Sequence, residues 1–339
     1  MNDSSNRPPF SIPVHLSGQT VAGIVRQLGG NLSWAQARQL IASRRVRVNG
    51  GLCLDDARRL KEGEVVEVLS ESDSPRPVER DVRILFADAD LVVVEKPPGI
   101  QTVRRAEERD WSDARKQRQP VLQELVERML TEGRRMGGQP LTVRAVHRLD
   151  RDTSGLMMFA LSTRAEQELV RRFARHQIQR VYWAVVHGIL REPRTIETRL
   201  VRDRGDRIRG SAPGGMKSAD GQRAVTHVRP VEEIGGAYSV VECQLETGRT
   251  HQIRIHLAEI GHMLCGERVY VRPRADAEVV ADQSGAPRQA LHSAELQFEH
   301  PVSGKVMKFE SGWPKDLARW IGRLREDTPN PKLENRNPK

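Results

Sequence analysis

The sequence predicts an α+β protein in which a small α/β domain precedes a larger domain built on a mixed, largely antiparallel sheet flanked by helices. Three observations predict this arrangement. The 339 residues exceed the usual size of one domain. A polar, proline-bearing segment at 71–80 reads as a linker between two stretches of patterned sequence. Beyond it, short strands alternate with amphipathic helices but without regular βαβ crossovers.

The first domain, predicted at 18–70, reads as two helices followed by a hairpin. Apolar residues recur at helical spacing in the first helix, and Ser33 is a favourable N-cap for the second. Asn49 and Gly50 follow a short Val-rich strand, and this dipeptide is the strongest short hairpin signal. Residues 1–17 are expected to form a flexible leader.

This first domain resembles an S4 domain, a small RNA-binding module. The resemblance rests on Ser33, Ala37, Arg38, Ile41, Arg44, Val46, Val48, Asn49, Gly50 and Gly63. It implies that arginines of this unit contact RNA phosphates, because each neutralised phosphate releases counterions. The candidates are Arg38, Arg44, Arg45 and Arg47. Taken alone, four arginines would more often indicate a solvated helix face, and it is the surrounding S4-like pattern that favours RNA contact.

The larger domain is predicted at 81–322. Its expected strands lie near 84–86 and at 91–94, 181–186, 239–245 and 291–298, where β-branched and other apolar residues gather. Residues 103–118 are charged and arginine-rich, and we expect an exposed loop there. The polar, proline-bearing segment 323–339 is expected to be a disordered tail.

Composition limits the function classes. Lys and Arg number 55 against 45 Asp and Glu, a formal net charge of +10, which favours a polyanionic partner such as nucleic acid. The three cysteines form no C-x-x-C pair, which argues against a disulfide framework or a zinc ribbon. The apolar run 156–161 is too short to cross a bilayer, and no signal peptide is readable. We therefore expect a cytoplasmic protein without a membrane partner.

The most informative segment is 147–155, which reads His-Arg-Leu-Asp-Arg-Asp-Thr-Ser-Gly. An isolated Asp-x-x-Ser-Gly would be read as a turn. Here seven positions together resemble the His-Arg-Leu-Asp-x-x-Thr-Ser-Gly motif of the RluA-type pseudouridine synthases. Further blocks of the same family match in order at 96–99, 180–188, 245–257, 290–292 and 300–304. The resemblance covers about residues 81–315.

The resemblance implies an isomerase that converts uridine in structured RNA to pseudouridine. The bond from C1′ to N1 breaks and C1′ joins C5 of the same base, so the reaction demands neither a cofactor nor a metal. The resemblance assigns the nucleophile to Asp150, its cationic partner to Arg249 and a phenol near the base to Tyr182. It places Arg148 in the space that the flipped base leaves. We expect His251, His256 and His292 to be structural.

Other expectations concern partners and rival functions. The S4-like unit favours large-subunit ribosomal RNA over transfer RNA, DNA is not expected, and a monomer is the default. One rival is a catalytically silent RNA-binding or ribosome assembly protein. Another is a metal-dependent phosphoesterase built from His147, Asp150 and Asp152, which lacks a further ligand cluster at metal spacing. The chain has Gly266-Glu267 where the family usually has Gly-Asp, and Arg180 where lysine is common.

Overall fold

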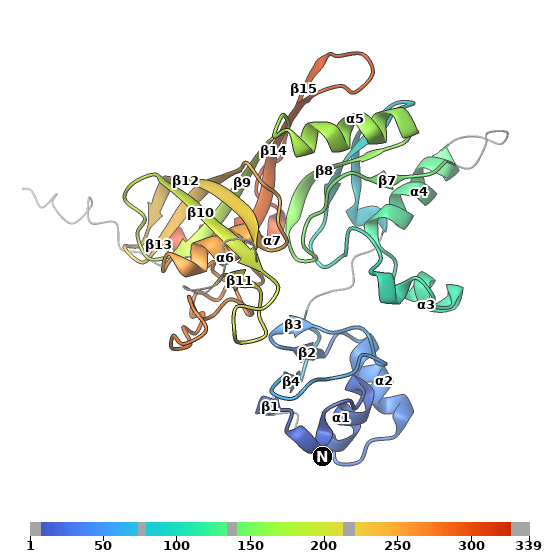
Figure 1. Ribbon diagram of the computed structural model, residues 1–339, viewed down its shortest axis with the longest axis vertical. Helices are drawn as coiled ribbons and strands as arrows, with labels where there is room; N and C mark the ends of the chain where they lie inside the picture. Colours follow the sequence, from blue (N-terminus) through green and yellow to red (C-terminus); the bar gives the residue numbers. More distant parts are fainter. Residues whose placement is uncertain (1–7, 74–78, 134–140, 213–220, 327–339) are drawn as a thin grey trace, which may run out of the picture. The chain divides into compact units, whose positions relative to one another are not determined.

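The computed structural model describes residues 8–73, 79–133, 141–212 and 221–326 (Figure 1). The chain divides into two compact units, Met1–Arg76 and Pro77–Lys339. The first carries a small antiparallel sheet with helices, and the second a large mixed sheet flanked by helices, so the predicted fold class is confirmed. Among the described residues, no helix is both long and apolar enough to span a membrane.

The first unit holds two helices against a four-stranded sheet of order β1-β4-β2-β3. Its elements are β1 (Phe10–Ser11), the 3-10 helix η1 (Val14–Leu16), α1 (Val21–Leu28), α2 (Trp34–Ala42), β2 (Val46–Val48), β3 (Gly51–Leu52) and β4 (Val65–Val68). Ser33 caps α2 as predicted, and its side chain accepts from the backbone N–H of Gln36. Asn49 and Gly50 have φ values of 51° and 72° and connect β2 to β3, which confirms the predicted turn.

The prediction of a flexible leader at residues 1–17 is wrong for its described part, which begins at residue 8. Phe10 and Ser11 form β1, which pairs with β4, and Ile12 is 1% exposed in the core of this unit. Because Ile12 also exchanges backbone hydrogen bonds with Gly63 and Glu64, the chain joins the small sheet before the first helix begins. Residues 1–7 of the leader lie outside the described residues.

The second unit begins with η2 (Glu79–Asp81) and ends with a helix. Its remaining elements in chain order are β5 (Arg83–Ala87), β6 (Leu91–Lys96), η3 (Ala106–Glu108), α3 (Asp113–Arg118), α4 (Leu122–Gly133), β7 (Arg144–Ala145), β8 (Ser154–Ala160), α5 (Thr163–Ala174), β9 (Gln179–His187), β10 (Arg194–Val201), β11 (Gly210–Ser211), β12 (Gln222–Ile234), β13 (Tyr238–Leu245), α6 (Gln252–Glu259), β14 (Leu291–Glu299), β15 (Val306–Glu310) and α7 (Lys315–Glu326).

Nine of these strands follow one another in the order β11-β10-β12-β13-β9-β14-β8-β6-β5, while β15 pairs with β14 and β7 with β8. Among the described strands, only β14 and β8 run parallel, and they share two register pairs, His292 with Ser154 and Ser293 with Gly155. Gly155 has φ +110°, and a Cβ there would lie 2.2 Å from the carbonyl oxygen of Ser293, so glycine is required at this crossing.

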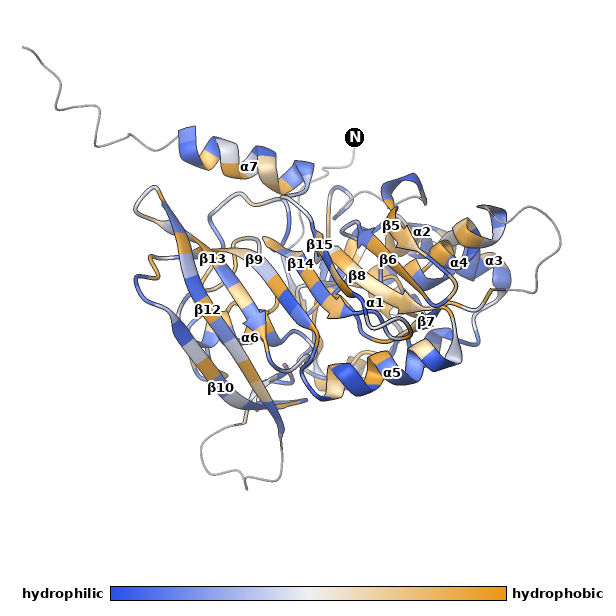
Figure 2. Cartoon of the chain, turned by 90° about the horizontal axis from the view of Figure 1, so that it is seen from above, coloured by the Kyte–Doolittle hydropathy of each residue, from blue (hydrophilic) through white to orange (hydrophobic). Residues whose placement is uncertain are grey.

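Helices cover both faces of the sheet. Alternate residues of β8 point to opposite sides, so Met157 and Phe159 pack in the core that includes α4, whereas Leu156 and Met158 pack against α5. The same alternation places α6 and α7 against different cores over the half that contains β9 and β13. Figure 2 shows α5 with apolar residues along one side and polar residues along the other, as expected for a helix lying on a sheet.

Two sequence predictions in this unit need correction. Residues 103–118 are not an irregular loop, because they contain η3 and α3 and are anchored by Arg104, whose guanidinium forms a bidentate pair with Glu124. The tail was predicted to start at residue 323, but α7 continues to Glu326. Residues 327–339 lie outside the described part of the chain.

Candidate active site

The loop that carries Asp150 connects β7 to β8 and is fixed on both sides of that residue. Before it, the hydroxyl of Thr102 donates to the carbonyl of Leu149 and accepts from its N–H. After it, the carbonyl of Arg151 accepts from the Lys96 ammonium at 2.7 Å. Arg288 donates to the carbonyl of Asp152 at 2.8 Å. Asp150 therefore sits on a backbone that its neighbours hold in one geometry.

Asp150 faces two nitrogen-bearing side chains in a pocket of about 300 Å³. Its Oδ2 lies 3.6 Å from Nη1 of Arg254, and its Oδ1 lies 3.7 Å from Nε2 of His251. Burial acts to raise the pKa of Asp150, but His251, Arg254 and Arg148 outweigh it and hold this pKa below its ordinary value. The carboxylate is thus kept ionised although its side chain is only 15% exposed.

Glu267 holds Arg254 in place. Its carboxylate accepts from Nε and Nη2 of Arg254 at 2.8 and 2.6 Å, and also from the backbone N–H groups of residues 268–270. Burial acts to raise the pKa of Glu267, but the charge and hydrogen bonds of Arg254 lower it to about 2. The Gly266-Glu267 pair therefore lies in the site itself, where the longer glutamate still reaches the arginine that faces Asp150.

His251 adopts a left-handed backbone conformation with φ 59°, directly before α6. Non-glycine residues rarely adopt this conformation, and it is found mostly where the surrounding structure imposes it. The hydroxyl of Tyr270 lies 2.7 Å from Nδ1 of His251. Burial lowers the pKa of His251 to about 4. At neutral pH His251 is therefore uncharged, and Arg254 supplies the lasting positive charge next to Asp150.

Tyr182 and Arg148 line the same pocket, as the sequence predicted for a common site. Tyr182 is on β9 and is 5% exposed. Burial raises its pKa, which Arg180 and Ser293 only partly offset. Arg148 is exposed, two residues before Asp150. A strand and a neighbouring loop supply these groups. A nucleotide that enters the pocket therefore meets the Asp150 carboxylate, the Tyr182 phenol and the long, cationic side chain of Arg148 together.

The cation assigned to Asp150 was predicted wrongly. Arg249 lines the pocket, but it is exposed and its Nε donates to the backbone carbonyl of Arg223 at 3.1 Å. Arg249 lies in the turn before α6, whereas Arg254 lies within the first turn of that helix. A sequence signal for Arg254 was present, because the same block, 245–257, contains this second arginine three residues after His251.

The histidines differ in their surroundings. His256 lies between the hydroxyls of Thr198 and Thr226, and His292 between those of Ser154 and Ser311, so both serve buried hydrogen-bond networks outside the pocket. His251 instead lines the pocket and faces Asp150. The expectation of a structural role therefore fits the geometry of the first two, whereas His251 is part of the candidate site.

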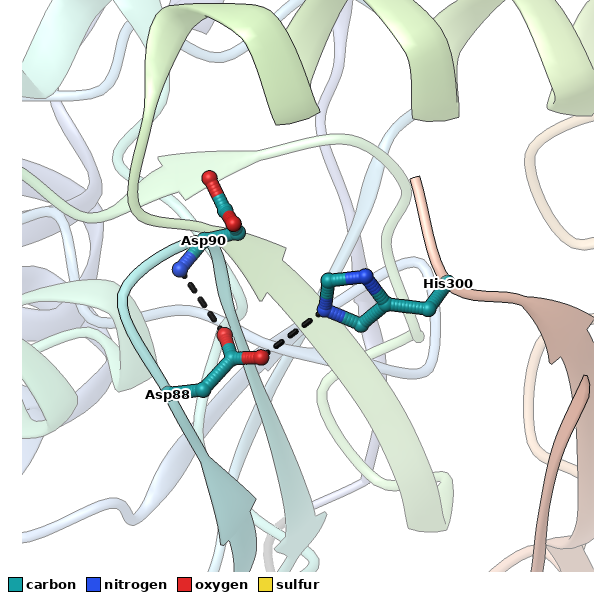
Figure 3. Close-up of side chains that lie close together, drawn as sticks. All are labelled: Asp88, Asp90 and His300. Carbon is teal, nitrogen blue, oxygen red and sulfur yellow. Dashed lines mark hydrogen bonds and ion pairs between the residues drawn. The ribbon is translucent and has the colours of Figure 1, made fainter. Parts of the chain in front are cut away.

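One further group has metal-ligand residue types. Asp88, Asp90 and His300 place their ligand atoms within 4.8 Å of one another (Figure 3). The backbone N–H groups of residues 302 and 303 donate to Nδ1 of His300, so its proton is on Nε2, which donates to Asp88 at 2.8 Å. A metal would require that same Nε2 without its proton. This cluster therefore ties the β5–β6 turn to the turn after β14.

The four arginines predicted to contact RNA differ in exposure. The side chain of Arg38 is 62% exposed and lies 3.4 Å from Asp56. Arg44 is buried at 5% exposure, and Arg47 is paired with Asp73 and Glu67. Arg45 donates to the carbonyl of Leu69. The structure thus corrects the prediction for Arg44 and Arg47, whose guanidinium groups serve the small unit itself, and leaves Arg38 as the most accessible candidate.

The family of the catalytic unit follows from comparison with known proteins. Residues 90–259 match the family described as RNA pseudouridylate synthase, and residues 24–66 match the S4 domain. The chain belongs to the RluA-type RNA pseudouridine synthases. It is therefore an isomerase that acts on RNA, with an S4 domain at its N-terminal end, and the rival readings as a silent assembly protein or a phosphoesterase are set aside.

Relatives of this synthase extend over nearly the whole chain. A protein from Neisseria meningitidis serogroup B, "Ribosomal large subunit pseudouridine synthase D", is 31% identical over 332 residues, which cover 96% of this chain and 83% of that one. The "Uncharacterized RNA pseudouridine synthase YlyB" of Bacillus subtilis is 35% identical over 78% of both chains. The human "RNA Pseudouridylate Synthase Domain Containing 4" has the same fold, with a TM-score of 0.55 at 21% identity over 71% of this chain and 92% of that one.

Proposed function

We propose that this synthase isomerises specific uridines of large-subunit ribosomal RNA, with Asp150 as the nucleophile. The observation that supports the catalytic assignment is the position of Asp150: its backbone is fixed on both sides, its side chain is only 15% exposed, and Arg254 keeps it ionised. The S4 domain supports the RNA class, as do the names of several relatives, which are large-subunit pseudouridine synthases at about 31% identity.

The roles around Asp150 follow from their chemistry. An ionised carboxylate at this position either attacks C1′ or removes the proton from C2′ when the bond to N1 breaks. Tyr182 supplies a buried phenol that exchanges a proton with the ribose or the detached base. Arg148 is exposed at the pocket and long enough to fill the space that the flipped base leaves. Arg254 keeps Asp150 charged, and Glu267 keeps Arg254 in position.

The catalytic assignment is tested with Asp150→Asn, which preserves size and removes the nucleophile. We expect no detectable release of tritium from RNA that contains 5-tritiated uridine, together with an unchanged melting temperature and an RNA affinity close to that of the wild type. Turnover at a rate comparable to the wild type would show that another group carries the reaction.

The substrate assignment is tested separately. Purified wild-type synthase is given transcripts of large-subunit ribosomal RNA and of transfer RNA, and pseudouridines in total RNA are mapped with and without the gene. We expect sites in large-subunit RNA to disappear with the gene and to reappear with the wild type, but not with Asp150→Asn. Loss of pseudouridine only from transfer RNA would overturn the proposed substrate.

A further inference from the structure

One wall of the active-site pocket is made of three stacked side chains. The ring of His147 lies 4.8 Å from that of Phe173 in a stacked arrangement. The guanidinium carbon of Arg180 lies 5.2 Å from the centre of the same phenyl ring. All three residues line the pocket that contains Asp150. Neither His147 nor Arg180 has a part in the reaction steps given above.

The tautomer of His147 follows from its hydrogen bonding. The backbone N–H of Met158 donates to Nε2 of His147 at 3.0 Å, so Nε2 carries no proton. Burial, with a further contribution from the charge of Arg180, lowers the pKa of His147 to about 3, so the ring is neutral. The single ring proton is then on Nδ1. This Nδ1 is buried and has no hydrogen-bond partner among the described residues.

Arg180 is a buried cation without a carboxylate. It is 7% exposed, it forms no ion pair within the described ranges, and its Nε is likewise a buried donor without an acceptor there. Its guanidinium is seated next to Gly248, where a Cβ would lie 2.9 Å from Nη1 of Arg180. The absence of a side chain at Gly248 therefore makes space for the guanidinium at the pocket wall, while no carboxylate of the described residues pairs with it.

Such an arrangement is costly unless a ligand completes it. A buried donor that lacks an acceptor costs about 1–3 kcal/mol, and more when it belongs to a charged group. The nearest carboxylate in the pocket, Asp150, already faces Arg254 and His251. A ligand that satisfies Arg180 and Nδ1 of His147 together must therefore bring a negative charge and acceptor oxygens. In RNA the group with both properties is the phosphodiester.

We propose that Arg180 and His147 form a binding site for one of the two phosphates that flank the target uridine. The proposal rests on the placement of the reaction at Asp150, because a ribose whose C1′ reaches Asp150 brings only its own two phosphates to the same pocket. Binding this phosphate after the nucleotide leaves its stack pulls the sugar towards the nucleophile. The planar guanidinium of an arginine can also bind the phosphate in a bidentate way, which a lysine ammonium cannot.

The test is a double-mutant cycle in which one change is made in the enzyme and the other in the RNA. Arg180→Met removes the charge and keeps an unbranched side chain, and a methylphosphonate removes the charge of a single phosphate. We expect about a 10- to 100-fold loss of kcat/KM from the variant alone. The neutral linkage on one side of the target uridine should cost the wild type a similar factor. At one of the two linkages, the variant and the methylphosphonate combined should lower kcat/KM little more than either change alone. If the two fold losses multiply in full at the linkages on both sides of the target uridine, the proposal is overturned.

Matched controls separate the phosphate site from general effects. Arg325→Met alters an exposed arginine of α7 that is paired with Glu232, and should behave like the wild type on both RNAs. A methylphosphonate several nucleotides away should show no coupling to Arg180→Met. Arg180→Lys should recover part of the lost rate only on the charged RNA. Thermal melting of each variant identifies losses that come from unfolding.

His147→Gln tests the second donor. The glutamine oxygen replaces Nε2 as acceptor for Met158, but no donor remains at the place of Nδ1. We expect a loss of about threefold to tenfold that is coupled to the same phosphate as Arg180. Coupling is also measured in binding affinity in the Asp150→Asn background. If Asp150→Asn still turns over while Arg180 remains coupled to the phosphate, the catalytic assignment fails and the phosphate site stands. If this coupling is absent, the phosphate site fails whatever the role of Asp150.

Discussion

Exchanging Arg254 for methionine and Glu267 for glutamine in one variant removes the charge that faces Asp150 without stranding a buried carboxylate. Two unit charges 3.6 Å apart attract each other by about 4–5 kcal/mol at an effective dielectric constant of about 20. This energy corresponds to a pKa change of up to about three units. Arg254 lowers the pKa of Asp150, and Glu267 raises it by a smaller amount, so losing both charges raises that pKa by less than the loss of Arg254 alone would.

The consequence appears in the pH dependence of the rate. Asp150 must be ionised to react, so activity is lost as the pH falls through its pKa. In the wild type that pKa is below its ordinary value, and the acidic limb lies below the assay range. In the double variant the limb should move up by as much as about three pH units. Single-turnover formation of pseudouridine between pH 5 and pH 9, a range of about four units, would record this movement.

Arg249→Met is the matched control. Arg249 lines the same pocket, yet its guanidinium donates to the carbonyl of Arg223 and it is not among the main charges that shift the pKa of Asp150. Its loss should leave the acidic limb where it is in the wild type. If the double variant is slower by the same factor at every pH, with an unmoved limb, Arg254 does not control the ionisation of Asp150 and the reasoning is refuted.

Three further predictions concern other parts of the chain. Arg148→Ala should slow single-turnover reaction strongly on a stacked target uridine and less on a mismatched one, whereas equal slowing would reject a role in base flipping. Deleting Met1–Arg76 should weaken RNA binding and flatten its salt dependence, and identical titrations at several salt concentrations would contradict RNA binding by the S4 domain. Gly155→Ala should lower stability by about 3 kcal/mol or more, because its Cβ meets the Ser293 carbonyl and φ is positive; an unchanged urea midpoint would disprove this constraint.

Local sequence signals predicted much of the fold. Ser33 marks the start of α2 because its side chain caps the helix, and Asn49-Gly50 marks a turn because both residues tolerate positive φ. The structure has the cap and the turn. The strand β1 was missed because two residues with one polar member carry no readable alternation. It is formed by pairing with β4, a partner more than fifty residues away, and such pairing leaves no mark in a short window.

At Asp150 one motif singles out one residue, and that residue lines the pocket. The cation that faces it was mispredicted where a motif offers a choice, because the block 245–257 contains two arginines, Arg249 and Arg254. The resemblance assigned Arg249, whereas in the structure Arg254, inside α6, faces the carboxylate, and Arg249, before that helix, donates to the Arg223 carbonyl. Glu267 could not be assigned from sequence, since its role depends on contact with Arg254, 13 positions earlier in the chain.

The parallel crossing of β14 with β8 has a consequence for biosynthesis. Strand β14 lies between β8, which follows Asp150, and β9, which carries Tyr182, so it joins the two halves of the sheet. It leaves the ribosome after both of those strands, with Leu291 as its first residue. Asp150 and Tyr182 can therefore be made, and each half can collapse, before β14 joins the halves into one sheet. We expect a nascent chain to stay inactive until β14 is inserted, because folding of the sheet must wait for a contact of high sequence separation.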